Sequence, residues 1–133
     1  MSLMRKKNYQ EVENKPAVLS DGTPVKDIYV RWLIDDEHDG AHNFAMRRFE
    51  IRPGIKVPLH SHKQDHEIYI LNGEGRFYND SGEDENVLSG DVLYIPPYEK
   101  HGIDNLGNSD LVFLCSIPYF KKNIEPLKSI PNE

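Results

Sequence analysis

The feature that most constrains the fold is a series of short segments rich in β-branched and aromatic residues, divided by turn residues. These segments are residues 28–34, 43–51, 67–71, 76–79, 86–88, 91–95 and 110–117. The letters NGEG at 72–75 form a strong hairpin signal between two of them. No stretch of about ten residues shows the 3.6-residue apolar period of a helix. Many short strands with regular turns are typical of a sandwich or barrel, so we expect an all-β fold.

The chain length of 133 residues suits one domain with its own core. Residues 1–27 are polar and include Pro16 and Gly22, which predicts an N-terminal arm. Residues 28–117 carry the strand pattern and are expected to form the barrel. Residues 118–133 show no period, and we expect them to form a C-terminal tail that packs on the barrel.

Charge and cysteine content exclude several classes of function. The chain has 16 basic and 22 acidic residues and a net charge of -6, so we expect neither nucleic acid nor a membrane as a partner. No window of about 18 apolar residues predicts a membrane-spanning helix. Cys115 stands alone in an apolar segment, which indicates a buried thiol and excludes a disulfide framework or a thiolate zinc site. A cytoplasmic location fits this composition.

Three histidines lie within seven positions of the segment PLHSHKQDHEIYILNG, residues 58–73. His60 and His62 are two residues apart, so on an extended segment both side chains point to the same face. Two imidazoles on one face can hold a single metal ion. An isolated H-x-H pair is weak evidence, because such pairs also occur as ordinary polar residues in surface loops.

The spacing of the residues around these histidines is more specific. In the first segment the fixed positions are Gly54, His60, His62, His66 and Gly73, and in the second they are Gly90, Pro96, His101 and Asn105. Together they resemble the two signature motifs of the cupin superfamily, over roughly residues 43–117. The resemblance implies a cupin-type jelly-roll barrel, also called a double-stranded β-helix. Tyr98 stands where the second motif usually has glycine, which alters a turn but removes no ligand.

The glutamate ligand of the first motif has a histidine in its place. Six residues separate His66 from Gly73, as the motif requires between its ligand and its glycine, whereas Glu67 is one residue out of register. Neighbours on a strand face opposite sides, so His66 and Glu67 cannot both point into the barrel. The chain thereby resembles small single-domain bacterial cupins with a four-histidine metal centre, which implies the ligand set His60, His62, His66 and His101. The alternative is a metal-free vestige of such a site.

This resemblance implies one divalent transition metal per chain, and imidazole ligands suit Mn, Fe, Ni, Cu or Zn. Four neutral ligands leave the charge of the ion uncompensated, which favours anionic or chelating oxygen ligands. An octahedral ion would keep two positions open for a substrate or dioxygen. A tetrahedral ion closed by four histidines would be purely structural.

The residues expected around the metal are mostly apolar. Ile68 and Ile70 share the parity of His66 and are expected to face inward. Phe44, Met46 and Arg48 share one face of the preceding strand, and Ala45, Arg47 and Phe49 share the other. Either arginine could meet a substrate carboxylate or lie on a solvent face. His38 and His42 fit neither motif and are expected at the surface.

The leading functional prediction is a small cytoplasmic metalloenzyme, a dioxygenase-type oxidoreductase acting on a small oxygen-bearing molecule. The sequence assigns no catalytic residue beyond the metal ligands. A metal-dependent isomerase or decarboxylase, a non-catalytic small-molecule sensor and a structural barrel remain alternatives. Small single cupins commonly pair through sheet edges, so we also expect a homodimer.

Overall fold

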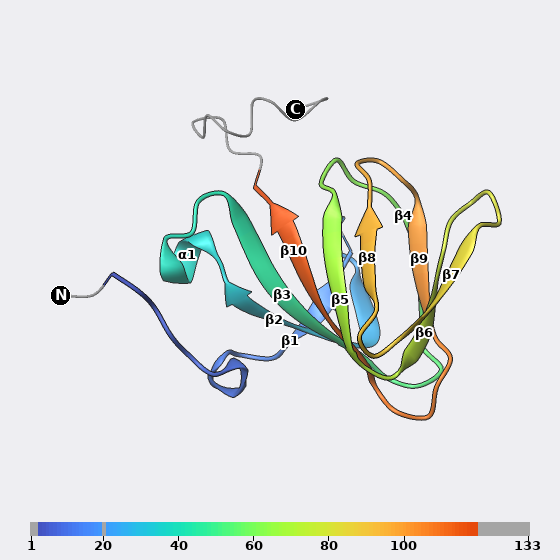
Figure 1. The fold of residues 1–133 in the computed structure, drawn as a ribbon, viewed down its shortest axis with the longest axis horizontal. Coiled ribbons are helices and arrows are strands. Elements are labelled where there is room, and N and C mark those ends of the chain that lie inside the picture. The colour runs from blue at the N-terminus through green and yellow to red at the C-terminus, as the bar shows by residue number, and fades with distance from the viewer. Residues whose placement is uncertain (1–2, 20, 120–133) are drawn as a thin grey trace.

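Ten strands form two antiparallel sheets that face each other in the computed structural model, which describes residues 3–19 and 21–119 (Figure 1). The six-stranded sheet has the order β1 (Lys15–Val18), β2 (Pro24–Ile34), β3 (Phe44–Ile51), β10 (Leu111–Pro118), β5 (His66–Asn72) and β8 (Val92–Ile95). The four-stranded sheet has the order β4 (Lys56–His60), β9 (His101–Asn105), β6 (Glu74–Tyr78) and β7 (Asp84–Leu88). The prediction of an all-β fold is confirmed.

Helical structure is slight in the described part of the chain. It consists of a 3-10 turn, η1 (Tyr9–Glu11), and a single helical turn, α1 (Asp36–Asp39). The Asp35 side chain caps α1 by accepting a hydrogen bond from the His38 backbone N–H, and Gly40 ends it in a left-handed conformation. Neither helix is long and apolar enough to cross a membrane.

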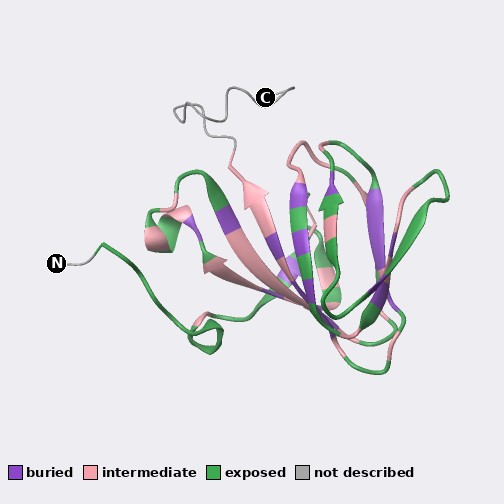
Figure 2. Ribbon diagram, viewed as in Figure 1, coloured by how far each residue is buried: buried purple, intermediate pink, exposed green. Residues whose placement is uncertain are grey.

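The alternating pattern along β5 decides which side chains enter the space between the sheets. His66, Ile68 and Ile70 are buried, whereas Glu67 and Tyr69 are exposed on the outer face (Figure 2). The inward parity predicted for the two isoleucines is therefore confirmed.

The core lies between the two sheets and draws on both of them. Phe113 of β10 stacks on Phe49 of β3 at 5.3 Å between ring centroids and meets Phe77 of β6 edge-on at 5.8 Å. Ile70 and Leu111 are fully buried, and each such side chain contributes about 1.5–3 kcal/mol of transfer free energy. The cluster thus joins the strands that carry the histidine motifs.

The segment before residue 28 includes a strand. β1 pairs antiparallel with β2, with Lys15 opposite Val30, and Ala17 of β1 is buried in the core. Pro16 is tolerated because β1 is an edge strand. The polar letters around these few residues hid the strand from the sequence analysis. The predicted tail at 118–133 lies outside the described residues except for its first two positions.

Candidate metal centre

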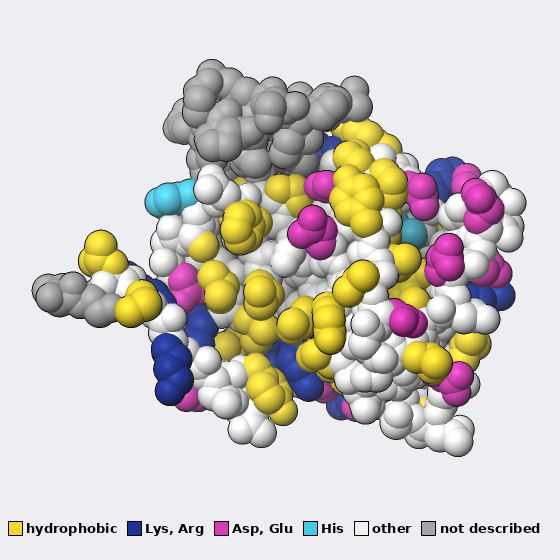
Figure 3. Space-filling model, in the orientation of Figure 1, with side chains coloured by type: hydrophobic (Ala, Val, Ile, Leu, Met, Phe, Trp, Pro, Cys, Tyr) yellow, Lys and Arg dark blue, Asp and Glu magenta, His cyan; other side chains and the backbone are white. Residues whose placement is uncertain are grey.

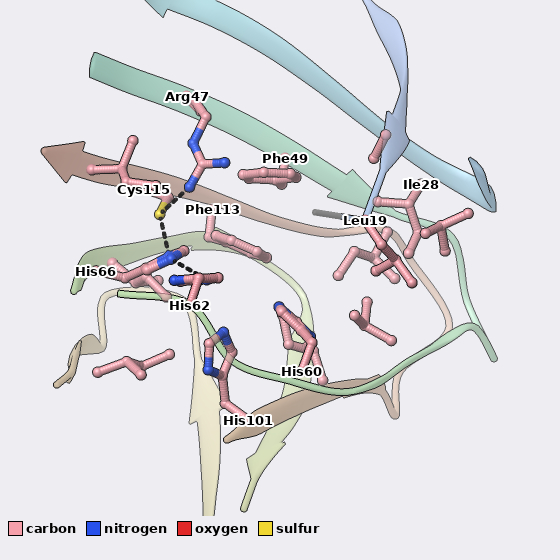
Figure 4. A pocket seen from close by; sticks show the side chains of 18 of the residues that line it. Leu19, Ile28, Arg47, Phe49, His60, His62, His66, His101, Phe113 and Cys115 are labelled. Carbon is pink, nitrogen blue, oxygen red and sulfur yellow. Dashed lines mark hydrogen bonds between the residues drawn. The ribbon is translucent and has the colours of Figure 1, made fainter. Parts of the chain in front are cut away.

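Three histidines, two from neighbouring strands and one from the loop between β4 and β5, converge between the sheets (Figure 4). His60 ends β4, His62 follows it in the next loop, and His101 begins β9. The pairing of β4 with β9 places His60 directly opposite His101. One ligand atom from each of the three side chains lies within 4.8 Å of the others, close enough for one metal ion to bind all three.

A backbone hydrogen bond sets the protonation of each of these three rings. The Nδ1–H of each ring donates to a carbonyl oxygen nearby in the chain, so the lone pair of each ring lies on Nε2. The acceptors for His60, His62 and His101 are the carbonyls of Pro58, Gln64 and Glu99, at 2.9, 2.8 and 2.9 Å. The donor set therefore fits a metal with a preference for neutral imidazole nitrogen.

His66 lines the same space from β5 but lies outside the three-histidine group. Its Nε2 is 2.9 Å from the Nε2 of His62, and its ring centroid is 5.5 Å from that of His101. Two nitrogen ligands about 2.1 Å from one ion and at right angles lie about 3 Å apart. The His62–His66 spacing matches that geometry. The neighbouring Glu67 is exposed on the opposite face.

Cys115 contacts His66 from the adjacent strand. The register of β10 places Cys115 opposite Arg47 of β3 on one side and opposite Ile68 of β5 on the other. Its Sγ lies 2.9 Å from His66 Nδ1, and Arg47 Nη2 donates to the same sulfur at 3.2 Å. The thiol is buried, as the apolar sequence around it predicted. It also has a polar role next to a candidate ligand.

These contacts form a chain with one consistent set of proton positions. Arg47 donates to Cys115 Sγ, the thiol S–H donates to His66 Nδ1, and His66 Nε2–H donates to His62 Nε2. A metal ion held by both histidines would need the Nε2 lone pair of His66 as well. The His66 proton would then lie on Nδ1 and face the Cys115 sulfur.

Burial favours the neutral form of three imidazoles, those of His62, His66 and His101. It lowers the pKa of His66 to about 2, with a further contribution from the positive charge of Arg47. Burial also lowers the pKa of His101 to about 4 and lowers the pKa of His62. Burial raises the pKa of the Cys115 thiol, and nearby Arg47 opposes that rise. Neutral rings are the form that binds a metal, so the electrostatics suit the proposed ligands.

The histidines open on a cavity of about 280 Å³ with apolar walls. Its lining includes Phe49, Phe77, Ile95, Ile103 and Phe113. Residues 17–19, from β1 and the turn after it, also contribute to the wall. The sequence did not predict that contribution, because these few apolar residues lie within an otherwise polar segment.

The structure separates the two arginines that the sequence left open. Arg47 lines the cavity, as does Phe49 on the same face of β3. Arg48 points the other way, where it pairs with Glu50 and lies over the Tyr9 ring. Because successive side chains of a strand point to opposite faces, the sequence predicts that Arg47 and Arg48 lie on different faces of β3. Which of the two faces the core depends on how the sheets pack, and the sequence pattern does not show that.

The histidines outside the motifs lie apart from the cavity. His38 and His42 are exposed, and each contacts an acidic side chain near α1. The prediction that both lie at the surface is therefore confirmed.

The turn before His101 keeps a conformation that favours glycine. Tyr98 occupies the motif's glycine position with φ +66°, in the left-handed region. Its backbone N–H donates to the carbonyl of His62 at 2.9 Å. The turn thereby ties the segment before β9 to the loop that carries His62. The histidines converge with tyrosine at this position.

Asn105, the last fixed residue of the second motif, is buried and holds a loop in place. Its side-chain N–H groups donate to the carbonyls of Ile51 at 2.8 Å and Ser109 at 3.0 Å. Its Oδ1 accepts from the Gly107 backbone N–H at 2.9 Å. The residue is structural and does not belong to the metal site.

Sequence comparison identifies the family to which this geometry belongs. The profile of the Cupin domain matches residues 47–117. The chain therefore belongs to the cupin family. It is 46% identical to an oxalate-binding protein of Thermotoga maritima over 81 residues, which are 60% of this chain and 64% of that relative. It is 33% identical over 117 residues to an uncharacterised protein of Methanocaldococcus jannaschii, covering 86% of this chain and 89% of that one.

Solved structures agree with this assignment. The polyketide cyclase RemF from Streptomyces resistomycificus superposes with a TM-score of 0.73 at 26% identity, covering 96% of this chain and 98% of that one. A predicted oxalate decarboxylase from Thermotoga maritima gives a TM-score of 0.69 at 29% identity, covering 85% and 97%. The molecule is thus a small cupin with a histidine cluster that could hold a metal ion.

Proposed function

We propose that His60, His62, His66 and His101 bind one divalent transition metal, and that the protein is a metal-dependent enzyme acting on a small oxygen-bearing molecule. The observation that carries the proposal is the convergence of the Nε2 atoms of His60, His62 and His101 beside an apolar cavity, with Nδ1 of each ring donating to a carbonyl oxygen. Mn, Fe, Ni, Cu and Zn all suit imidazole ligands.

The favoured reaction is a dioxygenase-type oxidation. Held by these four histidines, Mn, Fe, Ni or Cu would supply Lewis-acidic and redox chemistry, whereas Zn would supply only Lewis acidity. The protein's own residues hold the rings through the carbonyl hydrogen bonds and restrict water with Phe49 and Phe113.

Oxygen uptake tests the reaction. Protein loaded separately with each candidate metal would be mixed with small aromatic, enol and alkene substrates while dissolved oxygen is recorded. We expect substrate-dependent uptake with at least one metal and none with the His62→Ala variant. If no metal supports uptake although metal binds stoichiometrically, the oxygenase part is wrong.

A second candidate is metal-dependent binding or decarboxylation of a small carboxylate. It is favoured by the similarity to the oxalate-binding protein. Calorimetric titration with oxalate, and carbon dioxide release measured without oxygen, would distinguish it from the dioxygenase-type reaction. Binding without turnover would indicate a sensor or binding protein, and anaerobic release would indicate a decarboxylase.

A further inference from the structure

The positively charged guanidinium of Arg47 lies in the cavity wall and has few hydrogen-bond acceptors (Figure 4). Its guanidinium lies over the rings of Trp32 and Phe49, at 5.3 and 4.9 Å from the ring centroids. Its Nη2 donates to the Cys115 sulfur, which is a weak acceptor, and its Nε is buried with no hydrogen-bond partner. The contacts with these two rings restrict the orientation of the planar guanidinium.

Three other arginines on the two sheets, and Arg52 directly after β3, have oxygen partners. Their contacts are Arg31 with the carbonyls of Tyr9 and Val12, Arg48 with Glu50, Arg52 with Asp110, and Arg76 with Asp84 and Asp104. Within residues 3–19 and 21–119, no carboxylate forms an ion pair with Arg47. Arg47 is only partly buried, and its N–H groups without an oxygen partner remain able to bind an anion.

We infer that Arg47 is the anion-binding residue of the cavity and that its ligand is a monocarboxylate with a compact apolar body. The inference rests on the proposed function, because it takes the cavity beside the histidines as the ligand site. A planar guanidinium can bind a carboxylate through two parallel hydrogen bonds. The remaining walls, including Phe49, Phe113 and Ile68, offer apolar contact, and the volume of about 280 Å³ limits the ligand to a small molecule.

Benzoate and benzamide make a matched pair of probes, because they differ mainly in the charge of one group. Isothermal titration would be carried out with wild-type protein and with the Arg47→Gln, Arg47→Lys and Arg48→Gln variants. Each protein would be measured both after treatment with EDTA and after reloading with metal. Arg48→Gln is the control, since it removes the neighbouring charge on the opposite face of β3.

We expect the EDTA-treated wild type to bind benzoate about tenfold or more tightly than benzamide, because charged hydrogen bonds contribute at this level. Arg47→Gln should remove that preference and leave benzamide binding unchanged. Arg47→Lys keeps the charge without the planar fork, and it should retain part of the preference. Arg48→Gln should behave like the wild type.

Equal binding of benzoate by wild type and Arg47→Gln would overturn the inference, as would undetectable benzoate binding to the wild type at millimolar concentration. Thermal melting checks that each variant is folded, and Arg47→Lys provides the test if Arg47→Gln is not. A failure of the proposed metal function is distinguishable. It would leave the reloaded protein without metal while the benzoate preference of EDTA-treated protein persisted.

Discussion

Cys115 illustrates how a residue outside both motifs can control a candidate ligand. Its sulfur contacts His66 Nδ1 and accepts a hydrogen bond from Arg47, so it orients the ring from behind. The sequence predicted only burial for this thiol. The contact could not be foreseen, because it depends on the register between β5 and β10, which join residues 49 positions apart.

Replacing Cys115 should therefore weaken metal binding. Cys115→Ala removes the partner of His66 Nδ1, and we expect the metal affinity to fall about tenfold. Cys115→Ser keeps a group that can donate and accept, so its loss should be smaller. Competition against a chelator of known affinity measures both. An alanine variant that binds metal as tightly as the wild type would show that the contact does not position the ligand.

The left-handed backbone at Tyr98 gives a prediction about stability. Tyr98→Gly relieves the steric cost of φ +66°, and we expect the free energy of unfolding to rise by about 1 kcal/mol. Glu99→Gly, in the same turn, is the matched control and should lower it, because glycine there only adds freedom to the unfolded chain. Urea denaturation measures both. A destabilised Tyr98→Gly would contradict this account of the turn.

At the level of elements, runs of β-branched and aromatic residues predicted β3 and β5 well, at 43–51 and 67–71 against the observed Phe44–Ile51 and His66–Asn72. In β5 the buried and exposed residues alternate along most of the strand, and the glycine count placed His66 on the buried face. Within the predicted arm, β1 was missed because a four-residue edge strand containing Pro16 has too little pattern to recognise. The order of strands in the sheets likewise depends on long-range pairing that no local pattern records.

Asn105 links the end of β9 to neighbouring segments, and its loss should be costly. Asn105→Ala removes three hydrogen bonds and leaves the buried carbonyl of Ile51 without this partner. We expect the free energy of unfolding to fall by about 2–4 kcal/mol. Chemical denaturation measures the change, with the exposed Asn108→Ala as control. A change as small as that of the control would refute this structural role.

At the scale of the whole molecule, β8 is an edge strand of the six-stranded sheet formed by the described residues. Val92 is 72% exposed and Tyr94 is 54% exposed on this strand. Figure 3 shows hydrophobic side chains gathered on the outer face of the molecule. Exposed edges and apolar side chains of this kind are commonly covered by another chain. The homodimer expected from the sequence stays a prediction.

Sedimentation velocity tests that prediction. We expect a species of twice the 15.4 kDa chain mass, and Val92→Lys at the β8 edge should shift it towards the monomer. Glu85→Lys on the exposed part of β7 introduces a lysine elsewhere and serves as control. A wild type that stays monomeric at micromolar concentration would contradict the expected assembly.

The central claim is that the histidine cluster holds one metal ion, and metal content per chain tests it most directly. Elemental mass spectrometry would be applied to wild type, His62→Ala, His66→Ala and the surface control His42→Ala, each after incubation with the candidate metals and gel filtration. We predict close to one ion per chain in the wild type and in His42→Ala, with a sharp loss in His62→Ala and His66→Ala. Full metal content in His66→Ala would reduce the centre to three histidines. A wild type that retains none of the candidate metals would contradict the claim altogether.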